Sequence, residues 1–207
     1  LAFAYPGIQM LIVRRSHPEL SENHVNRLLS AYSAFPEDLK PRYSDDEKAF
    51  TFPWGSRLKL GYCDSEHDVL QYQGQEYDVL FVDEATQLTE NQFGWLDACV
   101  RGTKRFPKRT YITCNPGGVG HAWVKRLFID REYIRSERAE DYIFIQALVW
   151  DNGPLFEGDA GYRAAMKSLK KQYGKEKTLC ELKELAKRSA GYVRRLENLP
   201  KELRRAW

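Results

Sequence analysis

The chain has 207 residues, of which 43% are hydrophobic and 13% aromatic, and its formal net charge is +3. A chain of this length and composition can bury a hydrophobic core, and we expect one domain with an appendage. No apolar run approaches the length needed to cross a bilayer, and the four scattered cysteines show neither disulfide-scaffold density nor zinc-ligand spacing. We therefore expect a globular protein of a reducing compartment, with no membrane span.

The charge is distributed unevenly along the chain. Residues 162–207 contain 14 Lys and Arg against 5 Asp and Glu, which predicts a basic helical segment at 155–207 after a core at 1–154. In that segment, Lys167, Lys170 and Lys171 are candidates for contact with DNA phosphates. A solvated helical surface explains the same charges at least as well.

The first third of the chain alternates between strand and helix patterns. Four apolar residues at 10–13 indicate a buried strand, and helical spacing runs through residues 24–35 until Pro36. Alternation within residues 50–62 favours a hairpin that turns at 54–56 and lies beside the main sheet.

Residues 78–87 are the most informative stretch, because an apolar run leads directly into Asp83 and Glu84. Such a run indicates a strand buried on both faces of a parallel sheet, and these sheets place ligands at the carboxyl ends of their strands. Asp83 is suited to hold Mg²⁺ through water, and Glu84 to orient or deprotonate a water that attacks a γ-phosphate, as in a Walker B motif. The alternative is a buried strand that ends in a solvated acidic turn.

The next predicted strand, at residues 110–114, follows a predicted helix from Thr89 to Val100 and ends at Asn115. Because parallel strands end at the same edge of a sheet, Asn115 is expected near Glu84 and a γ-phosphate. Otherwise Asn115 simply caps the helix that follows, and the adjacent glycines permit positive φ.

A third strong strand is predicted at residues 142–149, with helical spacing from Tyr162 onward.

The sequence contains no glycine-rich loop ending in Gly-Lys-Ser/Thr, the Walker A loop that cradles phosphates. We therefore expect the isolated chain to have little or no ATPase activity. The simplest account is that the first strand, this loop and its helix lie upstream of Leu1.

The residues around the two strand ends resemble the ATPase domain of terminase large subunits of tailed phages and prophages. The similar blocks are residues 13–20, 72–78, 81–87 and 113–125, and residues 192–207 resemble the segment that precedes the nuclease domain. The resemblance implies an α/β fold with a three-layer, mostly parallel sheet of the additional-strand P-loop NTPase type and a helical C-terminal appendage. It also implies that the nuclease domain is absent from this chain.

The resemblance further implies an ATP-driven motor that translocates double-stranded DNA into a procapsid, in a protein that is also an endonuclease when complete. The implied partners are the terminase small subunit, the portal of the procapsid and neighbouring copies in a homo-oligomeric ring. The implied location is the host cytoplasm. Two other functions stay open: a helicase-like DNA-remodelling ATPase, and a non-enzymatic remnant that acts as an assembly or binding module.

Position by position, Asp83 matches the Mg²⁺-binding member of the Walker B pair and Glu84 the catalytic base that acts on ATP. Thr113 and Asn115 match the motif that couples hydrolysis to movement.

Some family members place an arginine finger just before the glycine of the loop that precedes Walker B. Gln73 precedes Gly74 there, so this loop is a candidate nucleotide-site loop without its arginine. Arg14 and Arg101 are the alternative arginine fingers or sensors, although an ordinary ion-pair or surface role suits each of them as well.

Overall fold

The computed structural model describes residues 1–134 and 137–147. The chain divides into two compact units, Leu1–Arg126 and Leu127–Trp207. The predicted boundary after residue 154 lies outside the described residues. The basic segment with Lys167, Lys170 and Lys171 lies outside them too.

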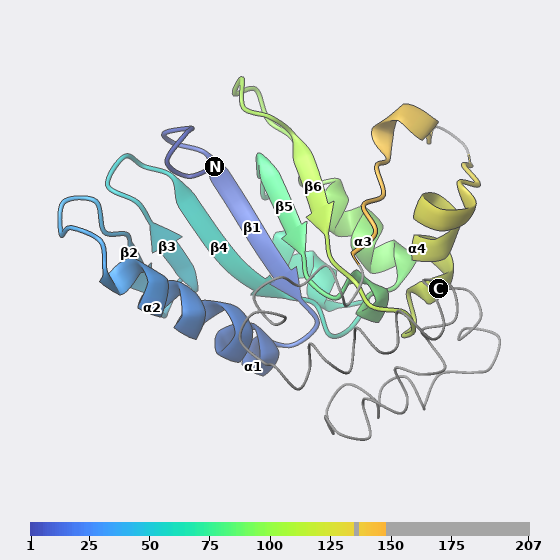
Figure 1. Cartoon of the computed structure of the whole chain (residues 1–207), viewed down its shortest axis with the longest axis horizontal. Helices are drawn as coiled ribbons and strands as arrows, with labels where there is room; N and C mark the ends of the chain where they lie inside the picture. The colour runs from blue at the N-terminus through green and yellow to red at the C-terminus, as the bar shows by residue number, and fades with distance from the viewer. Residues whose placement is uncertain (135–136, 148–207) are drawn as a thin grey trace, which may run out of the picture. The chain divides into compact units, whose positions relative to one another are not determined.

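A six-stranded sheet forms the centre of the first unit, in the order β2-β3-β4-β1-β5-β6 (Figure 1). The strands are β1 (Gln9–Arg14), β2 (Arg42–Ser44), β3 (Ala49–Thr51), β4 (Arg57–Tyr62), β5 (Val79–Val82) and β6 (Arg109–Ile112). Strands β4, β1, β5 and β6 run parallel, while β2 and β3 extend one edge in antiparallel fashion. This topology confirms the predicted α/β class with a mostly parallel sheet.

Helices cover the sheet on both faces, which gives the unit three layers (Figure 1). One face is covered by α1 (His17–Leu20), the π-helical turn η1 (Ser21–Val25) and α2 (Asn26–Ser33). The other face is covered by η2 (Asp68–Tyr72) and α3 (Glu90–Asp97). The remaining helical elements are η3 (Ala85–Gln87), α4 (His121–Val124), η4 (Lys125–Asp130) and η5 (Ala139–Asp141).

The core follows from the two-residue period of the strands, which sends alternate side chains to opposite faces. Met10, Leu58 and Val79 pack with Leu20 and Val25 in the main hydrophobic cluster beneath the first helical layer. On the opposite face, the ring of Tyr72 lies so close to Gly61 that any Cβ at this position would collide with it. A glycine is therefore required where η2 crosses the sheet.

The helix predicted over residues 24–35 begins earlier than expected, at His17. Pro18 lies in its first turn, where a missing N–H costs nothing, so proline starts this helix instead of blocking it. The later helix, α3, begins as predicted: Thr89 caps it through a capping box in which Gln92 returns the hydrogen bond.

The hairpin predicted within residues 50–62 is present as β3 and β4, and it turns at Gly55, whose φ is +80°. Its predicted position beside the main sheet is wrong, because β4 pairs along its whole length with β1 inside the sheet. Buried Leu58 and Leu60 explain this central position. The edge strand β2 was not predicted.

The strand predicted at residues 142–149 is wrong for residues 142–147, which have no regular structure, and its last two residues lie outside the described part. Ile143 and Ile145 are 76% and 84% exposed. β-branched residues form a strand only where a neighbouring strand completes the hydrogen-bond ladder.

Within the described ranges, no helix is long and apolar enough to cross a membrane.

Candidate active site

The carboxyl ends of β5 and β6 bring four polar side chains together, because the two strands pair in parallel. The amide Nδ2 of Asn115 donates a hydrogen bond to Oε1 of Glu84 at 3.0 Å, and Thr113 Oγ1 donates one to Oδ1 of Asp83 at 2.5 Å. The expected proximity of Asn115 and Glu84 is therefore present. The chemical roles of these four residues remain predictions.

The carboxylate of Asp83 is held from three sides. Arg14 Nη1 lies 2.7 Å and His24 Nε2 2.9 Å from Oδ2, and Thr113 contacts Oδ1. The hydrogen bond from His24 is the main cause that lowers the pKa of Asp83 from 3.8 to about 2, with help from Thr113 and from the charge of Arg14 and against the effect of burial. Because an ionised carboxylate only accepts hydrogen bonds, the Nε2 atom of His24 is the donor.

Sequence reasoning missed His24. The sequence places this residue only within a predicted helix, and no local pattern marks it as a site residue. The π-helical turn η1 carries it to the end of β5, and such turns occur often at functional sites. Only the packing of this helical segment on the sheet reveals the contact.

Arg14 is buried at the end of β1 and uses its guanidinium within its own chain. Its Nε pairs with Glu19 Oε2 at 3.0 Å, and its Nη1 pairs with Asp83 at 2.7 Å. This geometry is that of an ordinary ion pair, which is the alternative to a role as an arginine finger.

Arg101 and the loop of Gln73 and Gly74 do not lie beside Asp83. The backbone N–H of Arg101 donates to Tyr77 O, just before β5 begins, and its side chain lies 3.6 Å from Glu76 Oε1. Gln73 and Gly74 lie in the connection that leads from η2 to the same end of β5. The structure thus places both candidates away from the acidic end of the strand.

Glu84 has a left-handed backbone conformation, with φ of 57° and ψ of 49°. Non-glycine residues rarely adopt it, and such strain concentrates at functional sites. The next amide, of Ala85, donates to Thr113 O at 2.8 Å, which ties the turn to the end of β6. The backbone therefore turns sharply so that Glu84 faces Asn115.

The glycine-rich loop after β6 docks on the segment after β5. Thr86 Oγ1 donates to Asn115 O at 2.8 Å, and Gly120 N donates to Thr86 O at 2.8 Å. A Cβ at Gly118 or Gly120 would collide with the backbone oxygen of Thr86 or Leu88, respectively. The two segments can therefore approach this closely only with glycine at these positions.

Asp83 is the carboxylate at this end of the sheet that could hold a metal through water. Within the described part of the chain, no group of three or more His, Cys, Asp and Glu is arranged to hold a metal. Mg²⁺ usually keeps several waters and binds one or two carboxylates together with substrate phosphates. Asp83 is ionised at neutral pH and suits that role.

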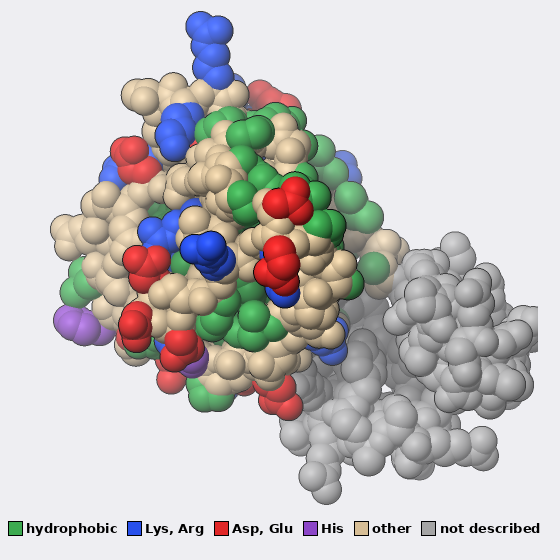
Figure 2. Space-filling model, turned by 90° about the vertical axis from the view of Figure 1, so that its left-hand side faces the viewer, with side chains coloured by type: hydrophobic (Ala, Val, Ile, Leu, Met, Phe, Trp, Pro, Cys, Tyr) green, Lys and Arg blue, Asp and Glu red, His purple; other side chains and the backbone are tan. Residues whose placement is uncertain are grey.

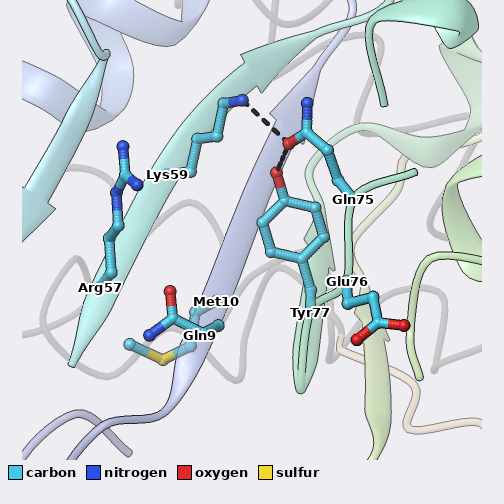
Figure 3. A pocket seen from close by; sticks show the side chains of 7 residues that line it. All are labelled: Gln9, Met10, Arg57, Lys59, Gln75, Glu76 and Tyr77. Atoms are coloured by element: carbon cyan, nitrogen blue, oxygen red, sulfur yellow. Dashed lines mark hydrogen bonds between the residues drawn. The ribbon is translucent and has the colours of Figure 1, made fainter. Parts of the chain in front are cut away.

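A separate cavity of about 240 Å³ lies at the amino ends of β1 and β4, away from Asp83 (Figure 3). Lys59 Nζ donates to Gln75 Oε1 at 3.0 Å, and the hydroxyl of Tyr77 donates to the same oxygen. Burial, with repulsion from Arg57, lowers the pKa of Lys59. This polar cavity belongs to the opposite end of the sheet from the candidate active site.

The first unit is thus an α/β domain with a mostly parallel sheet, whose two adjacent acids lie at the carboxyl end of a central strand, where sheets of this kind bind their ligands. The chain belongs to the family described as terminase large subunit, T4likevirus-type, N-terminal, whose sequence model matches residues 1–201. No curated protein matches the chain.

Two solved structures, both of the large terminase of a thermophilic bacteriophage, are similar to the chain. The first is 18% identical, with a TM-score of 0.49 over 63% of this chain and 32% of that protein. The second, a complex of that terminase with ADP, is 14% identical, with a TM-score of 0.43 over 56% of this chain and 28% of that protein. The similar region thus spans about a third of the length of these terminases.

Proposed function

We propose that this chain carries the hydrolytic and coupling residues of the ATP-driven motor of a viral terminase large subunit, which moves double-stranded DNA into a procapsid. Family membership supports the class of protein. The observation that carries the proposal is the hydrogen bond between Glu84 and Asn115, beside the ionised Asp83. It joins a candidate base to a candidate phosphate sensor across two adjacent strand ends.

In this proposal, each residue has a distinct task at a bound ATP. Mg²⁺, when bound, would supply positive charge beside the β- and γ-phosphates. Asp83 would hold this metal through water, and Arg14 and His24 fix the orientation of the Asp83 carboxylate. Glu84 orients the attacking water and accepts its proton.

Asn115 couples the chemistry to movement. Its amide contacts Glu84, and its backbone oxygen accepts a hydrogen bond from Thr86, so a shift of Asn115 strains both contacts. The loop after it docks through Gly120 on the segment after Glu84. Loss of the γ-phosphate is thereby felt in the loop that leads to α4.

The remaining parts of the proposal concern the complete protein. In this proposal, the complete protein is also an endonuclease. It acts with a terminase small subunit and the portal of the procapsid, as a homo-oligomeric ring in the host cytoplasm. Within that ring, a neighbouring copy is the source of any arginine finger, since Arg14 is engaged in ion pairs of its own chain.

The test measures ATP turnover by a protein in which this chain is joined to a phosphate-binding loop. We expect Glu84→Gln to lower turnover by about 10²–10⁴-fold, the usual contribution of a general base. Glu37→Gln, at an exposed site after α2, is the matched control and should turn over ATP normally.

Turnover that is insensitive to Glu84→Gln contradicts the motor proposal. An absence of turnover in the unsubstituted protein indicates instead an assembly or binding module. Turnover stimulated by single-stranded DNA without packaging partners indicates a helicase-like ATPase.

A further inference from the structure

A basic loop joins α3 to β6 at the end of the sheet opposite Asp83. Residues 98–129 contain no Asp or Glu, and the loop holds five cationic side chains within nine residues: Arg101, Lys104, Arg105, Lys108 and Arg109. In Figure 1 this loop projects beyond the amino end of β6. We refer to residues 101–109 as the basic loop.

Three of the five cations are anchored to the rest of the first unit. Lys108 Nζ lies 2.5 Å from Asp78 Oδ1, and Arg101 Nε lies 3.6 Å from Glu76 Oε1. Lys104 Nζ donates to the backbone oxygen of Gly7 at 3.3 Å. The basic loop is therefore held against the sheet instead of forming a free arm.

Asp78 makes this anchor firm, because it is itself buried. Its side chain is 5% exposed, and its Oδ2 accepts a hydrogen bond from Gln9 N at 2.9 Å. Phe106 adds an aromatic contact with Tyr5, at 6.3 Å between ring centroids. A surface fixed in this way loses little conformational entropy when it binds a partner.

Arg105 and Arg109 are exposed and have no ion-pair or hydrogen-bond partner for their side chains in the described ranges. Figure 2 shows Lys and Arg side chains at the upper end of the molecule, the same end at which the basic loop projects in Figure 1. Arginine binds phosphate through two parallel N–H donors, which suits it to a nucleic-acid backbone.

A structural role at the end of α3 does not account for these two arginines. The carboxyl end of a helix favours cations, but the effect fades within the last turn. Helix α3 ends at Asp97, and Arg105 and Arg109 lie well beyond it. Their charge thus serves neither the helix end nor an internal ion pair.

We propose that the basic loop is the surface through which this domain contacts the phosphate backbone of double-stranded DNA, with Arg105 and Arg109 as the contacting side chains. The inference rests on the proposed function and adds the surface that bears on the DNA. Contacts with the phosphate backbone of DNA carry no sequence information. A motor that moves along any DNA sequence requires contacts of this kind.

The connection to the candidate active site is short. Strand β6 begins at Arg109 and ends at Ile112, and Thr113 and Asn115 follow it. Four residues of strand span about 13 Å. The basic loop and Asn115 therefore lie at opposite ends of one short strand.

The test compares the affinity of the protein for a short random-sequence duplex over a range of salt concentrations, without nucleotide. Each phosphate contact contributes about 0.9 to the slope of log K against log salt. We expect the double variant Arg105→Ala/Arg109→Ala to reduce that slope by about 2 and to bind roughly tenfold more weakly or worse at moderate salt.

Two further variants make the test specific. Arg105→Lys/Arg109→Lys keeps both charges and should keep the slope. The double variant Arg27→Ala/Arg42→Ala removes two exposed cations from α2 and β2 and should bind the duplex as the unsubstituted protein does.

An unchanged slope in Arg105→Ala/Arg109→Ala overturns the proposal, as does an equal loss in the Arg27 and Arg42 variant. Circular dichroism establishes that each variant is folded. Because binding is measured without nucleotide, its outcome is independent of the Glu84 turnover test, so failure of one proposal is distinguishable from failure of the other.

Discussion

His24 Nε2 lies 2.9 Å from Asp83 Oδ2, although the two residues are 59 positions apart in the sequence. The imidazole comes from the π-helical turn η1, and Arg14 reaches the same oxygen from the end of β1. Two donors on one oxygen fix the orientation of the carboxylate before any ligand arrives, which is the arrangement expected of a preorganised site.

Replacement of His24 by phenylalanine should destabilise the domain by about 1–2 kcal/mol, because a hydrogen bond to a charged group is lost. Urea unfolding at neutral pH measures this change. His24→Gln keeps an N–H donor and should recover part of the loss, and His67→Phe, at an exposed site, should have little effect. Equal stability of His24→Phe and the unsubstituted protein would show that the contact contributes nothing.

The low pKa of Asp83 predicts a specific acid response. Its pKa is about 2 in the folded chain against 3.8 as the reference value, so its ionised form stabilises the fold above about pH 4. This contribution, about 1–2 kcal/mol, is lost as the pH falls from about 4 to about 2. Asp83→Asn should therefore be less stable at pH 7, and the difference should shrink across that range. A difference that is constant with pH contradicts the prediction.

The left-handed backbone of Glu84 predicts an unusual order of stability among its variants. Glycine adopts this conformation without the Cβ penalty, so Glu84→Gly should be more stable than Glu84→Ala by about 1 kcal/mol. Thermal unfolding of the two variants compares them directly, since both lack the carboxylate. If Glu84→Ala is the more stable variant, the turn is not strained at this residue.

Gly120 and Gly94 predict effects of opposite sign for the same substitution. A methyl group at Gly120 would collide with Leu88 O and with the indole of Trp123, so Gly120→Ala should cost about 1–3 kcal/mol. Gly94 lies within α3 with open space around it, so Gly94→Ala should stabilise by about 0.5–1 kcal/mol. Denaturant unfolding measures both. A Gly120→Ala variant as stable as the unsubstituted protein would show that docking of the loop does not require a glycine.

Much of the fold was predictable because its signals are local. The apolar run before Asp83, the alternation within residues 50–62 and the cap at Thr89 each depend on neighbours a few positions away, and each element is present. The proximity of Asn115 to Glu84 also followed, since parallel strands necessarily end at one edge.

The errors arose where a pattern required a distant partner. Residues 142–147 have strand propensity but are not in a strand. Strand β4 lies in the middle of the sheet because it pairs with β1, some 48 positions earlier by the register of Gln9 with Arg57. Neither outcome is encoded in a window of a few residues.

The sequence by itself determined the central parallel strands β1, β5 and β6, the acids at the end of β5 and the family to which the chain belongs. Only the tertiary structure decided that His24 and Arg14 hold Asp83, and that Arg105 and Arg109 lie at the far end of the strand that leads to Asn115. The physical reason is that periodicity fixes which face a residue occupies, whereas side-chain contacts depend on how separate elements pack together.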